Sequence, residues 1–428
     1  MTIEDSVWVD VGLLRVGLYI ELDVGWMSHP FPMGSFKISS QKQIDTIRNL
    51  GLLRVRCIPS KSDPEVAVPA VQEEAVPVDA RQQAVLREKE QRRLQAAALA
   101  AQDRRLVVCE RRFGESVRLY RKAMDLVQTQ PKVVAEQCEA MVSSYVADLL
   151  DQGEASIRLL SEAAGDKSSM HPVNVTIVSL LLGKAMGLSA SALQDLGVAA
   201  FLHDIGKVNV PDRVRWVEEN FSTAEYRMYQ EHVAQGVLLA KAMELRPGAQ
   251  LALAQHHELT DGSGFPMKLK GDAMSVAGRI LALVNRYDNL CNPSRPAAAL
   301  TPHEALSLIF AQFKTRFDVA ALSAFIRMMG VYPPGSVVQL IDDRYAIVVS
   351  VNSARPLKPR VIVHEPSVPK HEALILDLER APQLGIRRSL KPTSLPSSAM
   401  DYLAPRQRIC YFFEQASGLD SAPSPLHA

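Results

Sequence analysis

The chain has 428 residues, of which 47% are hydrophobic, and its formal net charge is +1. This length and apolar content predict two or three globular domains with a sizeable core. The balanced charge gives no general reason to expect nucleic acid or an anionic membrane as a partner.

Five scattered cysteines without a CxxC pair are typical of free thiols in a reducing cytoplasm. The first residues lack the basic and then apolar pattern of a signal sequence. The most apolar stretch, residues 173–182, is followed by Lys184, well short of the length needed for a membrane span. We therefore expect a soluble cytoplasmic protein with no membrane span.

Residues 1–60 combine short alternating runs, LLRVGLYIEL and LLRVRCIP, with one helical candidate, SSQKQIDTIRNLG. Ser39 or Ser40 would cap this helix and Gly51 would stop it. We predict a small α+β module here. Residues 61–80 are rich in Pro, Ala, Val and Glu without a consistent period, which predicts a linker.

Residues 81–132 are predicted to form a long charged helical connector, because Ala and Leu lie on one face and Arg and Glu on the other. Acidic residues alternate with the basic ones, which disfavours an arm that binds nucleic acid. A solvated helix, a helix pair and a homodimeric coiled coil over residues 81–127 all remain open.

Residues 133–330 read as successive amphipathic helices, which predicts an all-helical domain. Residues 331–370 show alternating β-branched runs between Asp- and Pro-rich turns, so we predict a small β extension. Residues 371–428 are predicted to be a variable tail with one short amphipathic candidate near 400–413. The predicted fold class is mainly α, with a small N-terminal α+β module and a small C-terminal β element.

Five histidines of the helical region form a candidate set, together with one aspartate that follows a histidine directly. Two of these histidines are adjacent, and neighbouring residues within a helix point about 100° apart. Beyond the end of a short apolar helix, however, both rings could face one pocket. The set consists of His171, His203, Asp204, His232, His256 and His257.

An acid beside a histidine at the end of an apolar helix is costly unless it is paired or bound to metal. Imidazoles from separate helices with one carboxylate match iron, manganese or zinc better than calcium or magnesium. One aspartate shared by two ions is a usual way to build a hydrolytic site, which makes Asp204 a catalytic candidate. On spacing alone, Lys207 could lie over a developing phosphoryl charge or be a surface lysine at a helix end.

The motifs HDIGK, HHE followed by DGSGFP, LKG and GRI occur in that order, with His232 between the first two. They resemble the HD-GYP subgroup of HD-domain metal phosphohydrolases over about residues 150–330. The stretch DVGLLRVGLYIELDVGWMSHPF is similar to a small domain of unknown function often found ahead of HD-GYP domains. The resemblance implies an HD-type helical domain that cleaves the bacterial messenger cyclic di-GMP to linear pGpG, with further cleavage to GMP left open, using iron or manganese.

Carried over by position, the resemblance implies that Asp204 is a bridging carboxylate and that Lys207 is catalytic. It implies that a GGDEF cyclase domain docks on the GFP turn, residues 264–266. The implied metal ligands are His171, His203, Asp204, His232, His256, His257 and Asn285. The implied substrate contacts are Asp261, Gly264, Phe265, Pro266, Lys270 and Arg295.

The sequence departs from the family pattern in ways that bear on activity. Asn285 stands where an aspartate ligand is expected, which removes one negative charge from the metal site. Phe265 replaces the tyrosine of GYP, so stacking survives while the hydroxyl is lost. Asp166 is the only carboxylate offered for a third metal, so we expect two ions. Three hypotheses remain: a cyclic di-GMP phosphodiesterase, a weak or inactive regulator that binds cyclic di-GMP or a cyclase domain, and a phosphohydrolase for another nucleotide.

Overall fold

The structure is a computed structural model that describes residues 6–22, 31, 33–50, 52, 54–64, 80–151, 155–161, 167–216, 221–352, 355 and 358–415. It divides into two units, residues 1–87 and 88–428. Three sequence predictions fall on residues outside this set: the helix stop at Gly51, most of the linker 61–80, and the carboxylate of Asp166.

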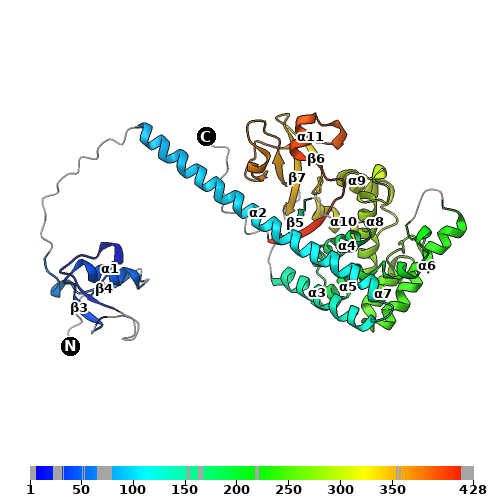
Figure 1. Ribbon diagram of the computed structural model, residues 1–428, viewed down its shortest axis with the longest axis horizontal. Helices are drawn as coiled ribbons and strands as arrows, with labels where there is room; N and C mark the ends of the chain where they lie inside the picture. The colour runs from blue at the N-terminus through cyan, green and yellow to red at the C-terminus, as the bar shows by residue number, and fades with distance from the viewer. Residues whose placement is uncertain are drawn as a thin grey trace. The chain divides into compact units, whose positions relative to one another are not determined.

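The N-terminal unit is a four-stranded antiparallel sheet in the order β1-β4-β2-β3, accompanied by one helix (Figure 1). Ile44 and Ile47 of the helix are buried with Ile20 of β2 and Val55 of β4, so one apolar helix face closes the core of the sheet. This confirms the predicted small α+β module. The elements are β1 (Val7–Asp10), β2 (Tyr19–Glu21), β3 (Ser35–Lys37), α1 (Gln41–Asn49) and β4 (Arg54–Cys57).

The second unit is mainly helical, as predicted, and the helices α4 and α5 lie at its centre (Figure 1). Helix α4 packs against α5 and α8, and α5 also packs against α3 and α7. None of the described helices has the length and apolar character needed to cross a membrane. The helices are α2 (Ala80–Leu126), α3 (Pro131–Asp151), α4 (Lys167–Ala185), α5 (Ala190–Leu202), α6 (Thr223–Ala242), α7 (Pro247–Ala254), α8 (Val276–Cys291), α9 (Pro302–Gln312), α10 (Val319–Met329) and α11 (Ser397–Leu403).

An antiparallel sheet completes this unit, and it is larger than the predicted β extension. Its main path runs β10-β6-β7-β5-β11, and β8 pairs with β7 and β9. Strand β5 lies within the range predicted to be all helical, and β9, β10, α11 and β11 lie within the predicted tail. The strands are β5 (Ala155–Leu159), β6 (Val337–Leu340), β7 (Tyr345–Asn352), β8 (Arg360–Val363), β9 (Leu376–Asp377), β10 (Ile386–Leu390) and β11 (Tyr411–Gln415).

These two differences have one physical cause. Strand β5 pairs with β11, and Tyr411 stands opposite Leu159 across some 250 residues of chain. A five-residue run is too short to show a period of its own, and its hydrogen-bonding partners become visible only in the folded chain. The C-terminal segment up to residue 415 is therefore an integral part of the domain, and its role as a variable tail is corrected.

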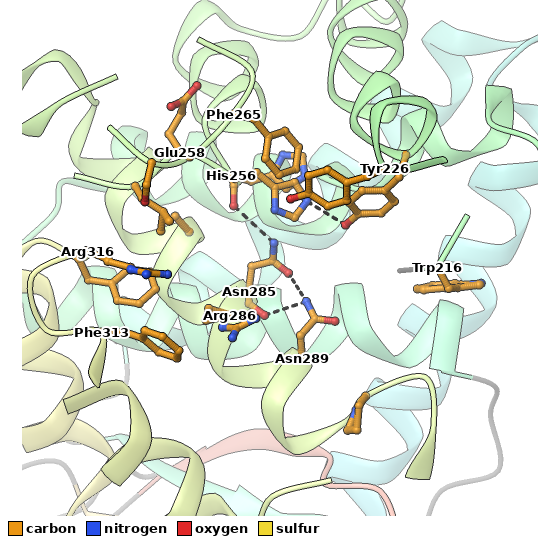
Figure 2. Close-up of a pocket in the computed structure, with 18 of the residues that line it drawn as sticks. Trp216, Tyr226, His256, Glu258, Phe265, Asn285, Arg286, Asn289, Phe313 and Arg316 are labelled. Carbon is orange, nitrogen blue, oxygen red and sulfur yellow. Dashed lines mark hydrogen bonds between the residues drawn. The ribbon is translucent and has the colours of Figure 1, made fainter. Parts of the chain in front are cut away.

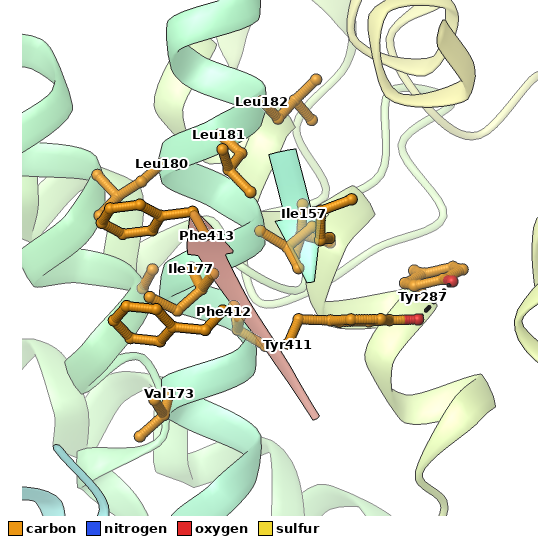
Figure 3. Packing of buried hydrophobic residues seen from close by; sticks show 14 of the residues in the cluster. Ile157, Val173, Ile177, Leu180, Leu181, Leu182, Tyr287, Tyr411, Phe412 and Phe413 are labelled. Carbon is orange, nitrogen blue, oxygen red and sulfur yellow. Dashed lines mark hydrogen bonds between the residues drawn. The ribbon is translucent and has the colours of Figure 1, made fainter. Parts of the chain in front are cut away.

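Strand β11 packs its aromatic side chains into the core beside α4 (Figure 3). The rings of Phe412 and Phe413 stack with centroids 4.9 Å apart, and both are buried. The hydroxyl groups of Tyr411 and Tyr287 lie 3.2 Å apart, which joins β11 to α8. The last strand of the domain thus supports the two helices, α4 and α8, that carry part of the candidate site.

Helix α2 is a single helix, and its second half belongs to the helical domain. Cys109, Phe113, Val117 and Tyr120 recur every three or four residues and are buried, so this face packs within the unit. Farther along, Arg121 donates to Ser169 Oγ at 3.2 Å and Gln128 donates to Asn209 Oδ1 at 2.6 Å. Helix α2 and the turn that follows it therefore contact both chain segments that carry the first histidines of the candidate site.

Candidate metal centre and nucleotide cavity

The five predicted histidines and Asp204 come together from four helices. His171 lies in the first turns of α4, and His203 directly follows α5. His232 lies within α6, whose start carries a capping box formed by Ser222 and Glu225. His256 and His257 follow α7. Apart from His257, which is partly exposed, these side chains are buried.

Asp204 is shared between two groups of potential metal ligands. One group is Asp204 with His171 and His203, and the other is Asp204 with His232, His256 and His257. Within each group the ligand atoms lie within 4.8 Å of one another. Asp204 Oδ2 lies 3.5 Å from His203 Nε2, and Oδ1 lies 3.6 Å from His232 Nε2. The two carboxylate oxygens therefore face different groups.

The backbone fixes the tautomers of three histidines. The Nδ1 atoms of His203, His232 and His256 contact the carbonyl oxygens of Ala200, Tyr229 and Leu253 at 2.7, 2.5 and 2.6 Å. Since a carbonyl can only accept, each Nδ1 carries the proton and each Nε2 presents a lone pair. Burial lowers the pKa of His203 to about 4 and the pKa values of His232 and His256 to about 3, so these rings are neutral near pH 7.

This arrangement fits a divalent cation. The Nε2 atoms of His232 and His256 lie 3.1 Å apart, and those of His171 and His203 also lie 3.1 Å apart. Two lone pairs this close repel each other unless a cation lies beside them. Neutral imidazole nitrogens with carboxylate oxygens are the donors that first-row transition metals such as iron, manganese or zinc accept. The residues present thus support a divalent metal site.

Lys207 is not a surface residue. It lies in the 3₁₀ helix Ile205–Asn209, is 6% exposed, and its Nζ donates to Asp204 Oδ2 at 2.7 Å. The ammonium group also lies 4.1 Å from the centroid of the Trp216 ring. The alternative that Lys207 is a surface lysine is therefore wrong. Its ammonium group lies beside the carboxylate of Asp204, which the two histidine groups share.

Sequence reasoning missed Asp288, which orients His171. Asp288 Oδ2 accepts from His171 Nδ1 at 2.5 Å, and Oδ1 accepts from the amides of Asn174 and Asn292 at 3.0 Å each. The same two asparagines hold the backbone of residue 409, through contacts of 2.7 to 2.9 Å. A carboxylate that fixes a ligand histidine is a usual second layer of a metal site, but His171 and Asn174 are more than 100 residues away from Asp288 in the sequence.

Asn285 lies in α8 beside the histidine pair. Its Nδ2 points to the carbonyl oxygen of His256 at 3.4 Å, and its Oδ1 accepts from Asn289 Nδ2 at 2.8 Å (Figure 2). Asn285 also lines the cavity next to the histidines. The predicted ligand position is therefore adjacent to the cluster, with its amide oxygen already engaged by Asn289.

The adjacent histidines point to different partners within one group. His256 Nε2 faces His232, whereas His257 Nε2 lies 3.2 Å from the Tyr229 hydroxyl. The ring of Phe265 stacks on His257, with centroids 4.5 Å apart and an interplanar angle of 19°. Glu258 is fully buried and accepts from the backbone N–H groups of residues 267 and 269 at 2.6 and 2.8 Å. The HHE motif therefore supplies two candidate metal ligands, and its Glu258 holds the backbone of the turn that covers them.

Gly264 allows the turn to approach the histidines closely. A Cβ atom at this position would lie 2.4 Å from the Leu259 nitrogen, 2.5 Å from the His257 oxygen and 2.6 Å from Glu258 Cα. We expect Gly264→Ala to displace this backbone, to lower the free energy of unfolding by about 1 to 3 kcal/mol and to reduce bound metal. Chemical denaturation and metal analysis would measure both effects.

A matched control is Gly114→Ala, because Gly114 lies within α2 and its Cβ would meet only the end of the Arg118 side chain, at 3.5 Å. Alanine in a helix should leave stability unchanged or raise it by about 0.5 to 1 kcal/mol. Unchanged stability and metal content in Gly264→Ala would contradict the close approach.

A cavity of about 540 Å³ opens beside the histidines (Figure 2). Of the predicted substrate contacts, Gly264 and Phe265 line it, whereas Asp261, Pro266, Lys270 and Arg295 are not among its lining residues. Asp261 accepts from Ser263 and pairs with Lys270 in a backbone bridge. Side chains that sequence reasoning missed also line the cavity: Trp216, Tyr226, Tyr229, Arg286, Asn289, Phe313 and Arg316.

Two protein-family models match successive parts of the chain. The family described as HD domain matches residues 136–321, and the domain of unknown function DUF3391 matches residues 6–138. The HD match contains every residue of the histidine cluster. The DUF3391 match covers the N-terminal sheet and continues through α2.

Curated relatives are similar to part or most of the chain. Cyclic di-GMP phosphodiesterase PA4108 of Pseudomonas aeruginosa is 26% identical over 374 residues, which cover 83% of this chain and 84% of the relative. The cyclic di-GMP phosphodiesterase response regulator RpfG of Xanthomonas campestris is 32% identical over 153 residues, 35% of this chain and 40% of RpfG. The 3′3′-cGAMP-specific phosphodiesterase 2 of Vibrio cholerae is 34% identical over 131 residues, 30% of this chain and 25% of that protein.

Proposed function

We propose that this chain, in which an HD domain follows a DUF3391 domain, is a metal-dependent phosphodiesterase of the HD-GYP type that opens cyclic di-GMP to linear pGpG. The observation that carries the proposal is Asp204, whose two oxygens face two separate histidine groups. A carboxylate placed in this way suits a pair of ions rather than one.

In this proposal one ion would be held by His171 and His203, the other would be held by His232, His256 and His257, and Asp204 would be a ligand shared by both groups. Iron or manganese is the proposed metal. Two divalent ions, when bound, supply Lewis-acid stabilisation of phosphoryl charge and lower the pKa of a water molecule. Asp288 keeps the Nδ1 proton of His171 in place, so that Nε2 remains available as a ligand.

Lys207 and the cavity complete the site. Hydrolysis adds one water across a phosphodiester P–O bond and leaves a terminal phosphate and a hydroxyl group. The Lys207 ammonium lines the cavity and can donate to a phosphoryl oxygen whose charge rises in the transition state. Phe265 and Tyr226 offer aromatic faces on which a base can stack.

A second candidate function follows from Asn285. Its amide oxygen already accepts a hydrogen bond from Asn289, and it brings no negative charge to the ions. A site weakened in this way would suit a regulator that binds cyclic di-GMP, or a GGDEF domain, with little turnover.

Two surfaces are compatible with protein partners. Pro266 and Met267 are exposed on the turn proposed to dock a GGDEF domain. Leu86 and Leu94 of α2 are also exposed, which is compatible with a homodimer.

Turnover by Asn285→Asp separates the two functions. The added carboxylate should strengthen metal binding about tenfold, because a charged ligand replaces a neutral one. We expect pGpG formation by the wild type and faster turnover by the variant at limiting metal, measured by chromatography of the nucleotide products. The control variant Gln312→Glu adds the same charge at an exposed position of α9 that does not line the cavity, and it should give no gain. Turnover only in Asn285→Asp would identify the wild type as a regulator.

A further inference from the structure

Two arginines and a phenylalanine form a cluster on the wall of the nucleotide cavity (Figure 2). Arg286 lies in α8, directly after Asn285, and Arg316 lies between α9 and α10. The guanidinium carbon of Arg286 is 5.1 Å from the centroid of Phe313, and that of Arg316 is 5.2 Å from the same ring. One aromatic ring therefore supports both cations.

The backbone of Arg316 is hydrogen-bonded to the segment that follows the HHE motif. Thr260 N donates to the Arg316 carbonyl oxygen at 2.9 Å, and Arg316 N donates to the carbonyl oxygen of Phe313 at 2.9 Å. On the far side of the loop, Asp318 caps α10 and receives Arg279 Nη1 at 3.1 Å. The loop from 313 to 318 is thus fixed at both ends, which places Arg316 at a defined position.

The charges of this cluster are poorly compensated. No carboxylate of the described residues pairs with Arg286. Arg316 has one distant acidic neighbour, Asp261 Oδ2, at 3.9 Å from its Nε. Two cations held together inside a cavity favour an anion between or beside them.

Resting on the proposed function, we propose that Arg286 and Arg316 bind the phosphate of a cyclic dinucleotide that is not being cleaved. A cyclic dinucleotide carries two phosphates on opposite sides of its ring, and only one can occupy the metal centre. The guanidinium group matches phosphate oxygens in a bidentate manner. Lys270 and Arg295, at the phosphate positions implied by the family resemblance, do not line the cavity, so the arginine pair takes over their role.

The test is equilibrium binding of cyclic di-GMP to the full-length protein kept metal-free with a chelator. Arg286→Gln and Arg316→Gln should each weaken binding about tenfold or more, as expected for a charge-assisted contact, and the double variant should weaken it further. The matched control Arg327→Gln, at an exposed position of α10, should leave the dissociation constant unchanged. An unchanged constant in the double variant, or no binding by the wild type, would overturn the inference.

Turnover by the metal-loaded proteins separates this inference from the proposed function. Arginine-dependent binding without turnover by the wild type would reject the phosphodiesterase and leave the inference standing. Turnover by the wild type together with an unaltered dissociation constant in the double variant would support the phosphodiesterase and reject the inference. If the arginines contact phosphate, the double variant should lose affinity for cyclic di-GMP and for 3′3′-cGAMP by similar factors. A loss confined to cyclic di-GMP would mean that the arginines recognise guanine, and it would overturn the phosphate assignment.

Discussion

Replacing Asp204 with alanine is expected to abolish turnover and to remove both metal ions. The carboxylate faces both histidine groups, so its loss affects both ions together. It also leaves the buried ammonium of Lys207 without its acceptor at 2.7 Å. We expect cyclic di-GMP hydrolysis to fall by at least about a thousandfold and bound metal to fall toward zero, measured on the same sample by product analysis and metal quantification.

The matched control for this variant is Asp272→Ala, because the Asp272 side chain is fully exposed and lies outside the histidine cluster. It should retain metal and turnover. Circular dichroism would verify that Asp204→Ala keeps its helical content. A variant that folds and still binds two ions would contradict the shared role of Asp204.

Asp288→Ala is expected to weaken metal binding although Asp288 belongs to neither ligand group. The change removes the acceptor of three buried donors, on His171, Asn174 and Asn292. Leaving buried donors without an acceptor should lower the free energy of unfolding by about 3 kcal/mol or more. Metal affinity should fall about 10- to 100-fold, since the imidazole of His171 loses the partner that fixes it.

Metal affinity distinguishes a positioning role of Asp288 from a general loss of stability. It has to be measured under conditions in which the variant is still folded. Asp288→Asn keeps one acceptor oxygen and should recover part of the affinity. As a destabilising control, Val142→Ala removes buried methyl groups between α3 and α5, away from the site. Equal metal affinity in Asp288→Ala and Val142→Ala at matched stability would show that Asp288 is only structural.

Much of the candidate metal centre could be predicted, because its candidate ligands lie at positions that are recognisable in the sequence. His203 and Asp204 end a buried apolar helix, and His256 and His257 precede a glycine-rich turn. The surrounding helices follow from their periodic apolar residues and caps. The predicted positions converge in the structure for each of the five histidines and for Asp204.

The contacts around this centre could not be predicted, because they join segments far apart in the chain. Asp288 reaches the C-terminal segment through Asn174 and Asn292, and a lone asparagine carries no sequence signal for such a contact. Strand β5 is recognisable only when β11 is beside it. Besides Lys207 of the HDIGK motif, the cavity is lined by the basic residues Arg286 and Arg316, which belong to no motif, whereas the motif positions Lys270 and Arg295 do not line it.

The number of divalent ions bound per chain tests the central claim most directly. Full-length wild-type protein, purified without oxygen and loaded with iron or manganese, would be analysed for metal and protein content. The shared carboxylate of Asp204 and the two histidine groups predict two ions per chain. One ion or none per chain would contradict the two-metal site and, with it, the proposed phosphodiesterase mechanism.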